Sequence, residues 1–328
     1  MLHRRGLLSA LGSAALLGPD GARAQPAGKV ARIGVVAIGG ATSDMAGALP
    51  PHSNTRAFLR GMAELGYAYG RDFVTEPCGV DRLSALSELV ALKPDVIVAT
   101  GGGDVLPTLQ KATSTIPVVM TAAPDPVNQG YVQSLARSGN NFTGMSLQSR
   151  ELTGKRLQLL KELVPDAGSV AIFWDPTNAD LWQRAQATGP ALGWKPVSVE
   201  IRTPSEIGAA FRRAVDAGAR ALLVPASVVL LSHAREVVGL AAESRLPAIY
   251  ELRPYVDAGG LLSYGADIEA IWRRAASYVD KLLKGANPAA LPIEQPTAFE
   301  LVINARTAKA LGLSIPPAVL IRADQVID

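Results

Sequence analysis

From Lys29 onward, short apolar runs rich in β-branched residues alternate with amphipathic stretches of about ten to fifteen residues. This alternation is typical of βαβ units, in which crossover helices join parallel strands. The apolar runs predict one series of strands at residues 31–36, 72–76, 96–99 and 118–120, and a second at 170–174, 197–201, 221–224 and 248–250. The stretches between them predict helices at residues 54–65, 82–92, 106–113, 151–163, 179–192, 205–217 and 232–244. The fold class is therefore predicted to be α/β.

The two series of strands repeat each other at an offset of about 130 residues. Residues 116–124 are answered by residues 246–254, and both prolines of the first segment keep their register in the second. The apolar strand at 96–99 recurs at 221–224. A duplicated α/β unit predicts two similar lobes facing each other across a cleft. Chance similarity between ordinary strand-turn-helix segments is the alternative.

Three segments are predicted to connect the lobes. Residues 141–146 join the two units, residues 259–265 leave the second one, and a helix at 266–283 would return the chain to the first lobe. A third crossing is expected near Gln295 and Pro296, before a strand at 300–303 and a helix at 305–311. Parallel connectors of this kind form a hinge, because a few backbone rotations in them open or close a cleft.

The first 24 residues are predicted to be a signal peptide. Arg4 and Arg5 form a positive start, residues 7–17 are apolar, and Ala22-Arg23-Ala24 offers small residues where a signal peptidase cleaves, after Ala24. We therefore expect a periplasmic protein, exported by either the general or the twin-arginine route. No later stretch reaches the roughly 18 to 20 apolar residues that a membrane-spanning helix needs.

Composition and charge limit the classes of partner that we expect. The formal net charge is +3, and residues 1–24 hold three arginines and one aspartate, so the rest of the chain has 29 basic and 28 acidic residues. This near balance gives no basic surface for nucleic acid, and we expect none as a partner. Cys78 has no second cysteine for an internal disulfide, so it is expected to be a small buried residue, with a reactive thiol as the alternative.

Common catalytic and cofactor motifs are absent from the sequence. Beyond the signal segment only His52, His233 and Cys78 offer soft metal ligands, and they lack ligand spacing. The turn at residues 100–103 follows a strand but has neither the lysine of a phosphate-binding loop nor the third glycine of a dinucleotide fingerprint. No Gly-x-Ser-x-Gly elbow occurs. We therefore expect no metal, no cofactor and no enzyme activity.

Polar and glycine-rich turns follow the predicted strands at the edge where open parallel sheets bind ligands. Helices begin at or beside these turns, so their backbone N–H groups and positive ends would favour a carboxylate. The candidate ligand-binding residues are Gly39, Gly40, Thr100, Gly101, Gly102, Ala123, Asp125, Asp175, Thr177, Asn178, Ser227, Tyr250 and Glu251.

Each of these residues also has a purely structural interpretation. Asp125, Asp175 and Asn178 are all suited to capping helices. The glycines at 101 and 102 suit a tight turn. Tyr250 and Trp174 would stack on an aromatic ligand or be buried core aromatics, and Glu251 and Arg253 would bind a zwitterion or each other. The sequence leaves both interpretations open.

Several longer motifs closely resemble the ABC transporter substrate-binding proteins of the tryptophan/tyrosine-binding type. They lie at residues 58–67, 95–99, 116–119, 125–127, 141–144, 155–165, 247–250, 258–265 and 296–312. The resemblance covers essentially the whole chain after the signal segment. It implies a type I periplasmic-binding fold, with two doubly wound parallel-sheet lobes joined by a multi-strand hinge. It also implies closure on a small-molecule solute and delivery to an ABC permease and its ATPase.

The lobes are expected to comprise residues 25–143 plus 265–295 and residues 144–264 plus 296–328, in a monomer. This chain departs from relatives that bind aromatic amino acids, which commonly carry Asp or Asn where it has Ser227 and Asn where it has Asp175. These differences would change the charge of the cleft, so the ligand of the family cannot be assigned to this chain by resemblance. We expect a small organic acid or an amino-acid-like solute, with or without an aromatic part. A sensory module for a membrane receptor and a cofactor-free exported enzyme are the alternatives.

Overall fold

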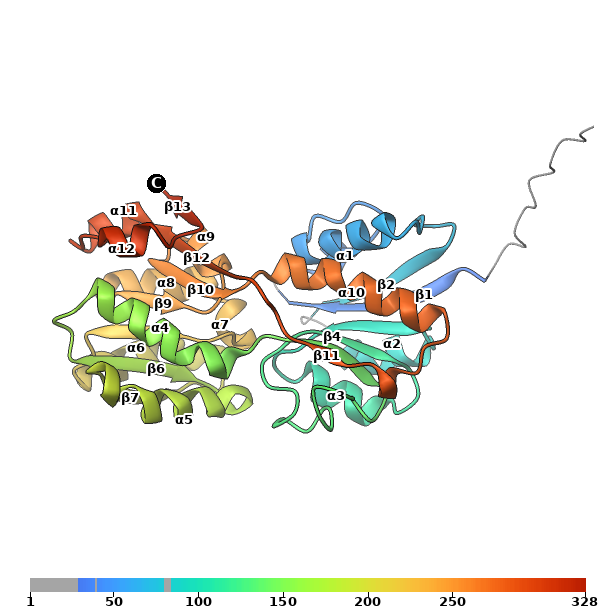
Figure 1. The fold of residues 1–328 in the computed structure, drawn as a ribbon, viewed down its shortest axis with the longest axis horizontal. Helices are drawn as coiled ribbons and strands as arrows, with labels where there is room; N and C mark the ends of the chain where they lie inside the picture. Colours follow the sequence, from blue (N-terminus) through green and yellow to red (C-terminus); the bar gives the residue numbers. More distant parts are fainter. Residues whose placement is uncertain (1–28, 39, 80–83) are drawn as a thin grey trace, which may run out of the picture.

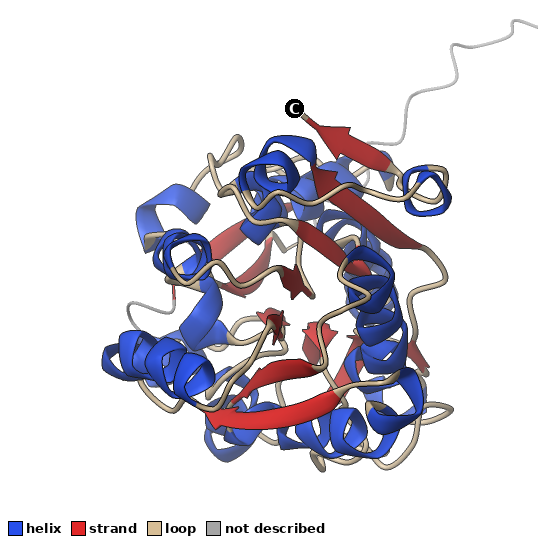
Figure 2. Ribbon diagram, turned by 90° about the vertical axis from the view of Figure 1, so that its left-hand side faces the viewer, coloured by secondary structure: helices blue, strands red, loops and turns tan. Residues whose placement is uncertain are grey.

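The computed structural model describes residues 29–38, 40–79 and 84–328, and these residues form two lobes, each built on one β-sheet (Figure 1). The predicted signal peptide and Gly39 lie outside the described residues. Helices flank both sheets, as the view along the molecule shows (Figure 2). The predicted α/β class with two doubly wound, mainly parallel sheets is confirmed.

The first lobe has a six-stranded sheet in the order β11-β5-β4-β3-β1-β2, with every pair parallel. Its strands are β1 Ala31–Ala37, β2 Phe73–Gly79, β3 Val96–Thr100, β4 Val118–Ala123, β5 Phe142–Ser146 and β11 Ile293–Glu294. Its helices are η1 Thr42–Met45, α1 Ser53–Glu64, α2 Leu86–Ala91, α3 Val105–Ala112, α10 Ile268–Leu283 and η6 Pro288–Ala290. Helices α1 and α10 pack in the core on one face of the sheet, and α2 and α3 pack on the other.

The second lobe has a seven-stranded sheet in the order β13-β12-β10-β9-β8-β6-β7, parallel except for the pair β10 and β12. Its strands are β6 Ser169–Trp174, β7 Lys195–Glu200, β8 Ala221–Val224, β9 Ala248–Tyr250, β10 Leu262–Ala266, β12 Phe299–Asn304 and β13 Gln325–Ile327. Its helices are α4 Ser149–Leu163, η3 Pro176–Asn178, α5 Ala179–Thr188, η4 Pro190–Leu192, η5 Pro204–Glu206, α6 Ile207–Asp216, α7 Val228–Leu231, α8 Ala234–Glu243, α9 Pro254–Asp257, α11 Ala305–Ala310 and α12 Pro317–Leu320.

The repeat predicted from the sequence is present in the topology. The order β5-β4-β3-β1-β2 in the first sheet matches the order β10-β9-β8-β6-β7 in the second, strand for strand. The echoing segments 116–124 and 246–254 contain β4 and β9, which hold the same position in their sheets. The two lobes therefore present equivalent strand ends to each other.

The chain crosses between the lobes three times, after β5, after β10 and after β11 (Figure 1). Strand pairing places Ser146 in the first sheet and Ala266 in the second. These two crossings therefore lie a few residues later in the chain than the predicted division at 143/144 and 264/265, because each connector continues its strand before it leaves the sheet. The exact residue bounds of the two lobes remain a proposal.

Local chemistry explains where the helices depart from the predicted ranges. The predicted helix 179–192 ends at Thr188 and is followed by the short turn η4, because Pro190 has no N–H to continue the α-helical bonding. The predicted helix 82–92 begins at Leu86, and residues 80–83 lie outside the description. Cys78 is buried in the core, as expected. Within the described residues, no helix has both the length and the apolar character needed to cross a bilayer.

Candidate ligand-binding site

A cleft with a volume of about 890 Å³ lies between the lobes, at the carboxyl ends of their central strands. The first lobe contributes residues that follow β1, β3 and β4, and the second contributes residues that follow β8 and β9. Two of the connectors also line it, at Leu147 and at the segment 266–269 that begins α10. This volume is in the range of small-molecule sites. Of the predicted site residues, Gly40, Thr100, Gly102 and Ser227 line the cleft.

Thr100 is a predicted site residue whose side chain is available to bind a ligand. It ends β3, its residue is only 8% exposed, and it lines the cleft. Its hydroxyl has no hydrogen-bond partner among the described residues. A hydroxyl can both donate a hydrogen bond to a ligand and accept one from it. Thr100 is therefore suited to hydrogen-bond a bound molecule.

His52 lines the same wall and fixes the start of helix α1. Its Nδ1 accepts a hydrogen bond from the backbone N–H of Thr55 at 3.3 Å, and its Nε2 donates to the carbonyl of Ile38 at 2.8 Å. The bond to the carbonyl requires a proton on Nε2. Ser53 and Asn54, in the first turn of α1, also face the cleft. His52 was not among the predicted ligand-binding residues, so its position beside the cleft was missed.

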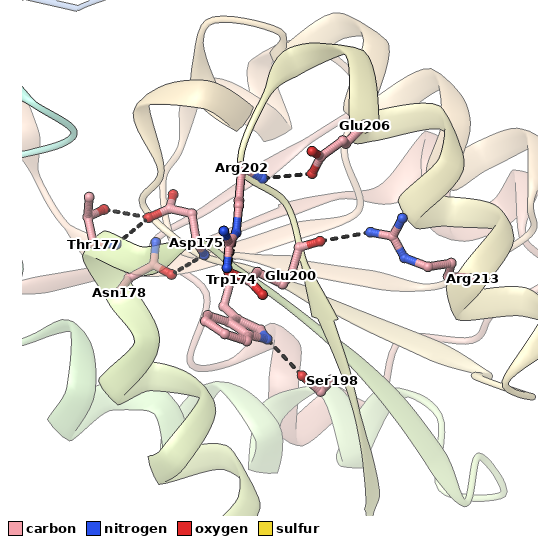
Figure 3. A network of polar contacts seen from close by, with 9 residues as sticks. All are labelled: Trp174, Asp175, Thr177, Asn178, Ser198, Glu200, Arg202, Glu206 and Arg213. Atoms are coloured by element: carbon pink, nitrogen blue, oxygen red, sulfur yellow. Dashed lines mark hydrogen bonds and ion pairs between the residues drawn. The ribbon is translucent and has the colours of Figure 1, made fainter.

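Ser227 connects the cleft wall to a polar turn behind it. Its Oγ donates to Oδ2 of Asp175 at 2.5 Å and accepts from the backbone N–H of Leu230 at 3.4 Å, as the cap of α7. Oδ1 of Asp175 accepts from the backbone N–H of Thr177 at 2.8 Å. Oδ1 of Asn178 accepts from the N–H of Asp175 at 2.8 Å (Figure 3). Asp175, Thr177 and Asn178 therefore form a capped turn behind the cleft lining, which is the structural interpretation left open by the sequence.

Trp174 and Tyr250 also lie outside the cleft lining. The indole of Trp174 turns away from the Asp175 turn and donates to Oγ of Ser198 at 2.8 Å (Figure 3). The ring of Tyr250 stacks on that of Tyr255, with centroids 4.8 Å apart and an interplanar angle of 16°. Burial raises the pKa of the Tyr250 hydroxyl. Both aromatic rings are thus held by contacts within the second lobe.

Glu251 belongs to a buried network rather than to the cleft surface. Its carboxylate accepts hydrogen bonds from the hydroxyl of Ser149 and from the backbone N–H of Ala226. Nη2 of Arg156 lies 3.1 Å from Oε1 of Glu251, as an ion pair without hydrogen-bond alignment. Both charged side chains are almost fully buried. The predicted alternative, pairing of Glu251 with Arg253, is wrong, because Arg253 instead contacts Asp257 and Glu300.

Gly101, Ala123 and Asp125 shape the first lobe beside the cleft. A Cβ on Gly101 would lie 2.2 Å from the Cα of Ala123, so this glycine permits close approach of two strand ends. Asp125 accepts from both the backbone N–H and the side-chain amide of Asn128, and lines a separate cavity of about 440 Å³. None of the three residues lines the larger cleft.

The charged residues of the cleft were largely missed by the sequence analysis. Asp257, Asp267, Glu269 and Glu300 line it together with Arg253. They come from the starts of α10 and β12 and from the short helix α9. The predicted connectors at residues 259–265 and near 295 could have indicated these charged residues, because residues that follow a hinge strand lie beside the cleft.

The two lobes come close to each other near Gln129 and near Gly102. Nε2 of Gln129 donates to the carbonyl of Thr177 at 2.5 Å. A Cβ on Gly102 would lie 2.9 Å from Cγ2 of Val228 on the other lobe. Burial raises the pKa of the Asp180 carboxyl, and the negative charge of Asp125 across the gap raises it further. In the described part of the chain, no group of three or more His, Cys, Asp or Glu residues is arranged to hold a metal ion.

The sequence of this chain is similar to those of known solute-binding proteins. A family model described as ABC transporter substrate binding protein matches residues 58–327. A tyrosine-binding protein of Clostridioides difficile is 27% identical over 269 residues, which cover 79% of this chain and 76% of the relative.

Solved structures show the same fold. A conserved domain protein from Vibrio cholerae O1 biovar El Tor is 25% identical, with a TM-score of 0.82. The ABC domain in complex with L-Trp from Streptococcus pneumoniae is 24% identical, with a TM-score of 0.81. Each match covers 91% of this chain and 100% of the other.

Proposed function

The chain belongs to the family of ABC transporter substrate-binding proteins, and from this premise we propose that it captures a small amino-acid-like or organic-acid solute in the cleft between its lobes. The proposal includes export, with the signal peptide cleaved after Ala24, and delivery of the solute to a membrane permease with its ATPase. The solute would be released unchanged, so the protein would act as a monomeric receptor and not as an enzyme.

One observation carries the proposal. The cleft of about 890 Å³ is lined by both lobes and by the connectors between them. A solute that contacts both walls interacts best when the lobes are together, and so it favours the closed arrangement over an open one. The tyrosine-binding relative and the L-Trp complex support an amino-acid-like solute.

A solute screen tests the proposal. We expect at least one amino acid or small organic acid to raise the thermal stability of the purified protein. A ligand present at 100 times its dissociation constant should add about 2.7 kcal/mol to the free energy of unfolding. Chromatography of the released solute should return it intact. Consumption of the solute, or no stabilisation by any compound, would contradict the proposal.

Hinge closure is tested by a substitution on the lobe contact. We expect Gly102→Val to weaken binding of the best solute of that screen by about tenfold or more, because the new side chain meets Val228 on the opposite lobe. An overpacking cost of about 1–3 kcal/mol corresponds to this loss of affinity. The stability of the unliganded protein should change little, since Gly102 faces the cleft.

Val228→Ala provides the control for this prediction. In the double variant Gly102→Val/Val228→Ala, the space left at position 228 should restore most of the affinity relative to Val228→Ala alone. Calorimetric titration measures all four proteins. Unchanged affinity in Gly102→Val would mean that binding does not require the observed approach of the lobes.

A further inference from the structure

We infer that the solute has a net positive charge and carries both a carboxylate and a cationic nitrogen group, as a basic amino acid does. The inference rests on the proposed function, because it assigns the chemistry of the same cleft. It separates this chain from receptors of neutral aromatic solutes and rules out plain organic acids. The argument begins with the charges on the cleft wall.

Carboxylates outnumber cations on the described lining of the cleft. Five acidic side chains line it, and Arg253 is the one guanidinium among them; the acidic residues are Asp44, Asp257, Asp267, Glu269 and Glu300. Acidic walls in a partly enclosed cleft concentrate negative potential and raise the local concentration of cations. An anionic solute would have to overcome the same potential.

The internal pairing leaves this negative charge poorly compensated. Arg253 is shared by two carboxylates, with Nε 3.5 Å from Oδ1 of Asp257 and Nη1 3.4 Å from Oε2 of Glu300. Burial raises the pKa of the Glu300 carboxyl; Arg253 opposes the shift, and the charge of Asp267 adds to it. Glu269 has no charged or hydrogen-bonded partner among the described residues. A ligand ammonium or guanidinium group would supply the missing positive charge.

The acidic side chains also have the placement that an extended organic cation needs. Asp267 and Glu269 lie at the start of α10, on a connector between the lobes, whereas Glu300 lies in β12 of the second lobe. Asp267 and Glu300 both line the same cleft. A cationic nitrogen between them would contact the second lobe and the hinge at once.

The start of helix α1 in the first lobe offers the complementary site for a carboxylate, and Oδ2 of Asp44, the acidic residue on this wall, accepts from the backbone N–H of Ala41 at 3.1 Å. Helix α1 has 12 residues and no acidic side chain in its first turn, and Ser53 and Asn54 of that turn line the cleft. Thr100, a largely buried residue whose hydroxyl has no partner in the described residues, lines the same space. A helix N-terminus and a hydroxyl donor suit a carboxylate. Both charged ends of a basic amino acid would thus be held, the carboxylate by the first lobe and the cation by the hinge and the second lobe.

Calorimetric titration with five probes tests the inference. L-Lysine and L-arginine have a net positive charge, L-tryptophan is a neutral zwitterion, cadaverine lacks the carboxylate, and indole-3-acetate lacks the amine. We expect lysine or arginine to bind at least about tenfold more tightly than tryptophan or cadaverine. Tryptophan lacks the contact made by the side-chain cation, and cadaverine lacks the contact made by the carboxylate. Indole-3-acetate should not bind measurably, and added salt should weaken lysine binding.

Variants connect the charge preference to the named residues. Glu269→Gln and Glu300→Gln should each weaken binding of lysine or arginine by about tenfold while changing tryptophan binding less. Asp216→Asn, an exposed aspartate of α6 away from the cleft, is the matched control and should bind as the wild type does. Thermal unfolding checks that each variant is folded.

The outcomes separate the two proposals. Tightest binding of tryptophan or indole-3-acetate would overturn the basic-solute inference but leave the receptor function intact. Equal affinity of Glu269→Gln, Glu300→Gln and Asp216→Asn for the basic probes would also overturn it. If no small solute of any charge stabilises the protein, both proposals fail together.

Discussion

Replacing Arg156 with methionine should lower the free energy of unfolding by about 3–5 kcal/mol, because it leaves the carboxylate of Glu251 buried without its counter-charge. Arg156 is fully buried in α4. Its Nε donates to the carbonyl of Tyr264 at 2.8 Å and its Nη1 to the carbonyl of Ser149 at 2.9 Å. Burial lowers the pKa of this guanidinium, opposed mainly by the charge of Glu251. The substitution therefore removes an ion pair and two hydrogen bonds from the base of two connectors.

Urea denaturation measures this loss, and two variants make it specific. Arg156→Met/Glu251→Gln should recover part of the stability, because it removes the unpaired charge. Arg322→Met breaks a partly exposed ion pair with Glu162, which lies on α4 as Arg156 does, and should cost no more than about 1 kcal/mol. Equal effects of Arg156→Met and Arg322→Met would contradict the assigned role of the buried pair.

The loss should extend to solute binding. Glu251 holds the backbone N–H of Ala226 at 2.9 Å, and Ala226 and Ser227 line the cleft. When the carboxylate loses Arg156, this loop loses its fixed position. Arg156 and Glu251 are thus positioning residues, which support the cleft wall without lining it.

Gly101→Ala should lower the free energy of unfolding by about 1–3 kcal/mol or more, through a clash that only backbone movement can relieve. A Cβ at this position would lie 2.2 Å from the Cα of Ala123, 2.4 Å from its nitrogen and 2.6 Å from the oxygen of Ala122. Ala122 lines the cleft and already has a positive φ of 61°. The displaced strand end should therefore weaken solute binding as well.

The same substitution at Gly154 is the matched control. Gly154 lies within helix α4, and a Cβ there meets no atom within 4 Å. Because alanine is the better helix former, Gly154→Ala should raise the free energy of unfolding by up to about 1 kcal/mol. Thermal and urea unfolding should thus give opposite signs for the two variants. A neutral Gly101→Ala would mean that the ends of β3 and β4 can separate at little cost.

Much of the fold follows from local sequence. The central strands β3 and β8 are buried on both faces of their sheets, and such strands have continuous apolar sequences. The offset repeat predicted two similar lobes, and the two sheets have the same strand order over five strands. Element ends were less predictable, as at Thr188, because a proline and the hydrogen bonds of a single turn decide them.

The candidate site was predictable in location more than in membership. Turns at the carboxyl ends of the strands do surround the cleft, and Thr100 and Ser227 line it. Asp175 and Glu251 also follow strands at this edge of the sheet, but their carboxylates contact protein groups. Asp175 accepts from Ser227, and Glu251 contacts Ala226 and Arg156. Sequence position cannot distinguish these cases, since a polar residue after a strand can face the cleft or satisfy a buried partner.

The sequence by itself determined the α/β class, the duplicated unit and the edge of the sheets at which a ligand would bind, because these depend on periodic apolar burial and on parallel strand direction. Only the tertiary structure decided which side chains meet in the cleft. Asp44 and Glu300 are far apart in the chain, and the crossings between the lobes bring both to the same space. The charge of a cleft is a sum over residues brought together by folding, so no single segment of the sequence contains it.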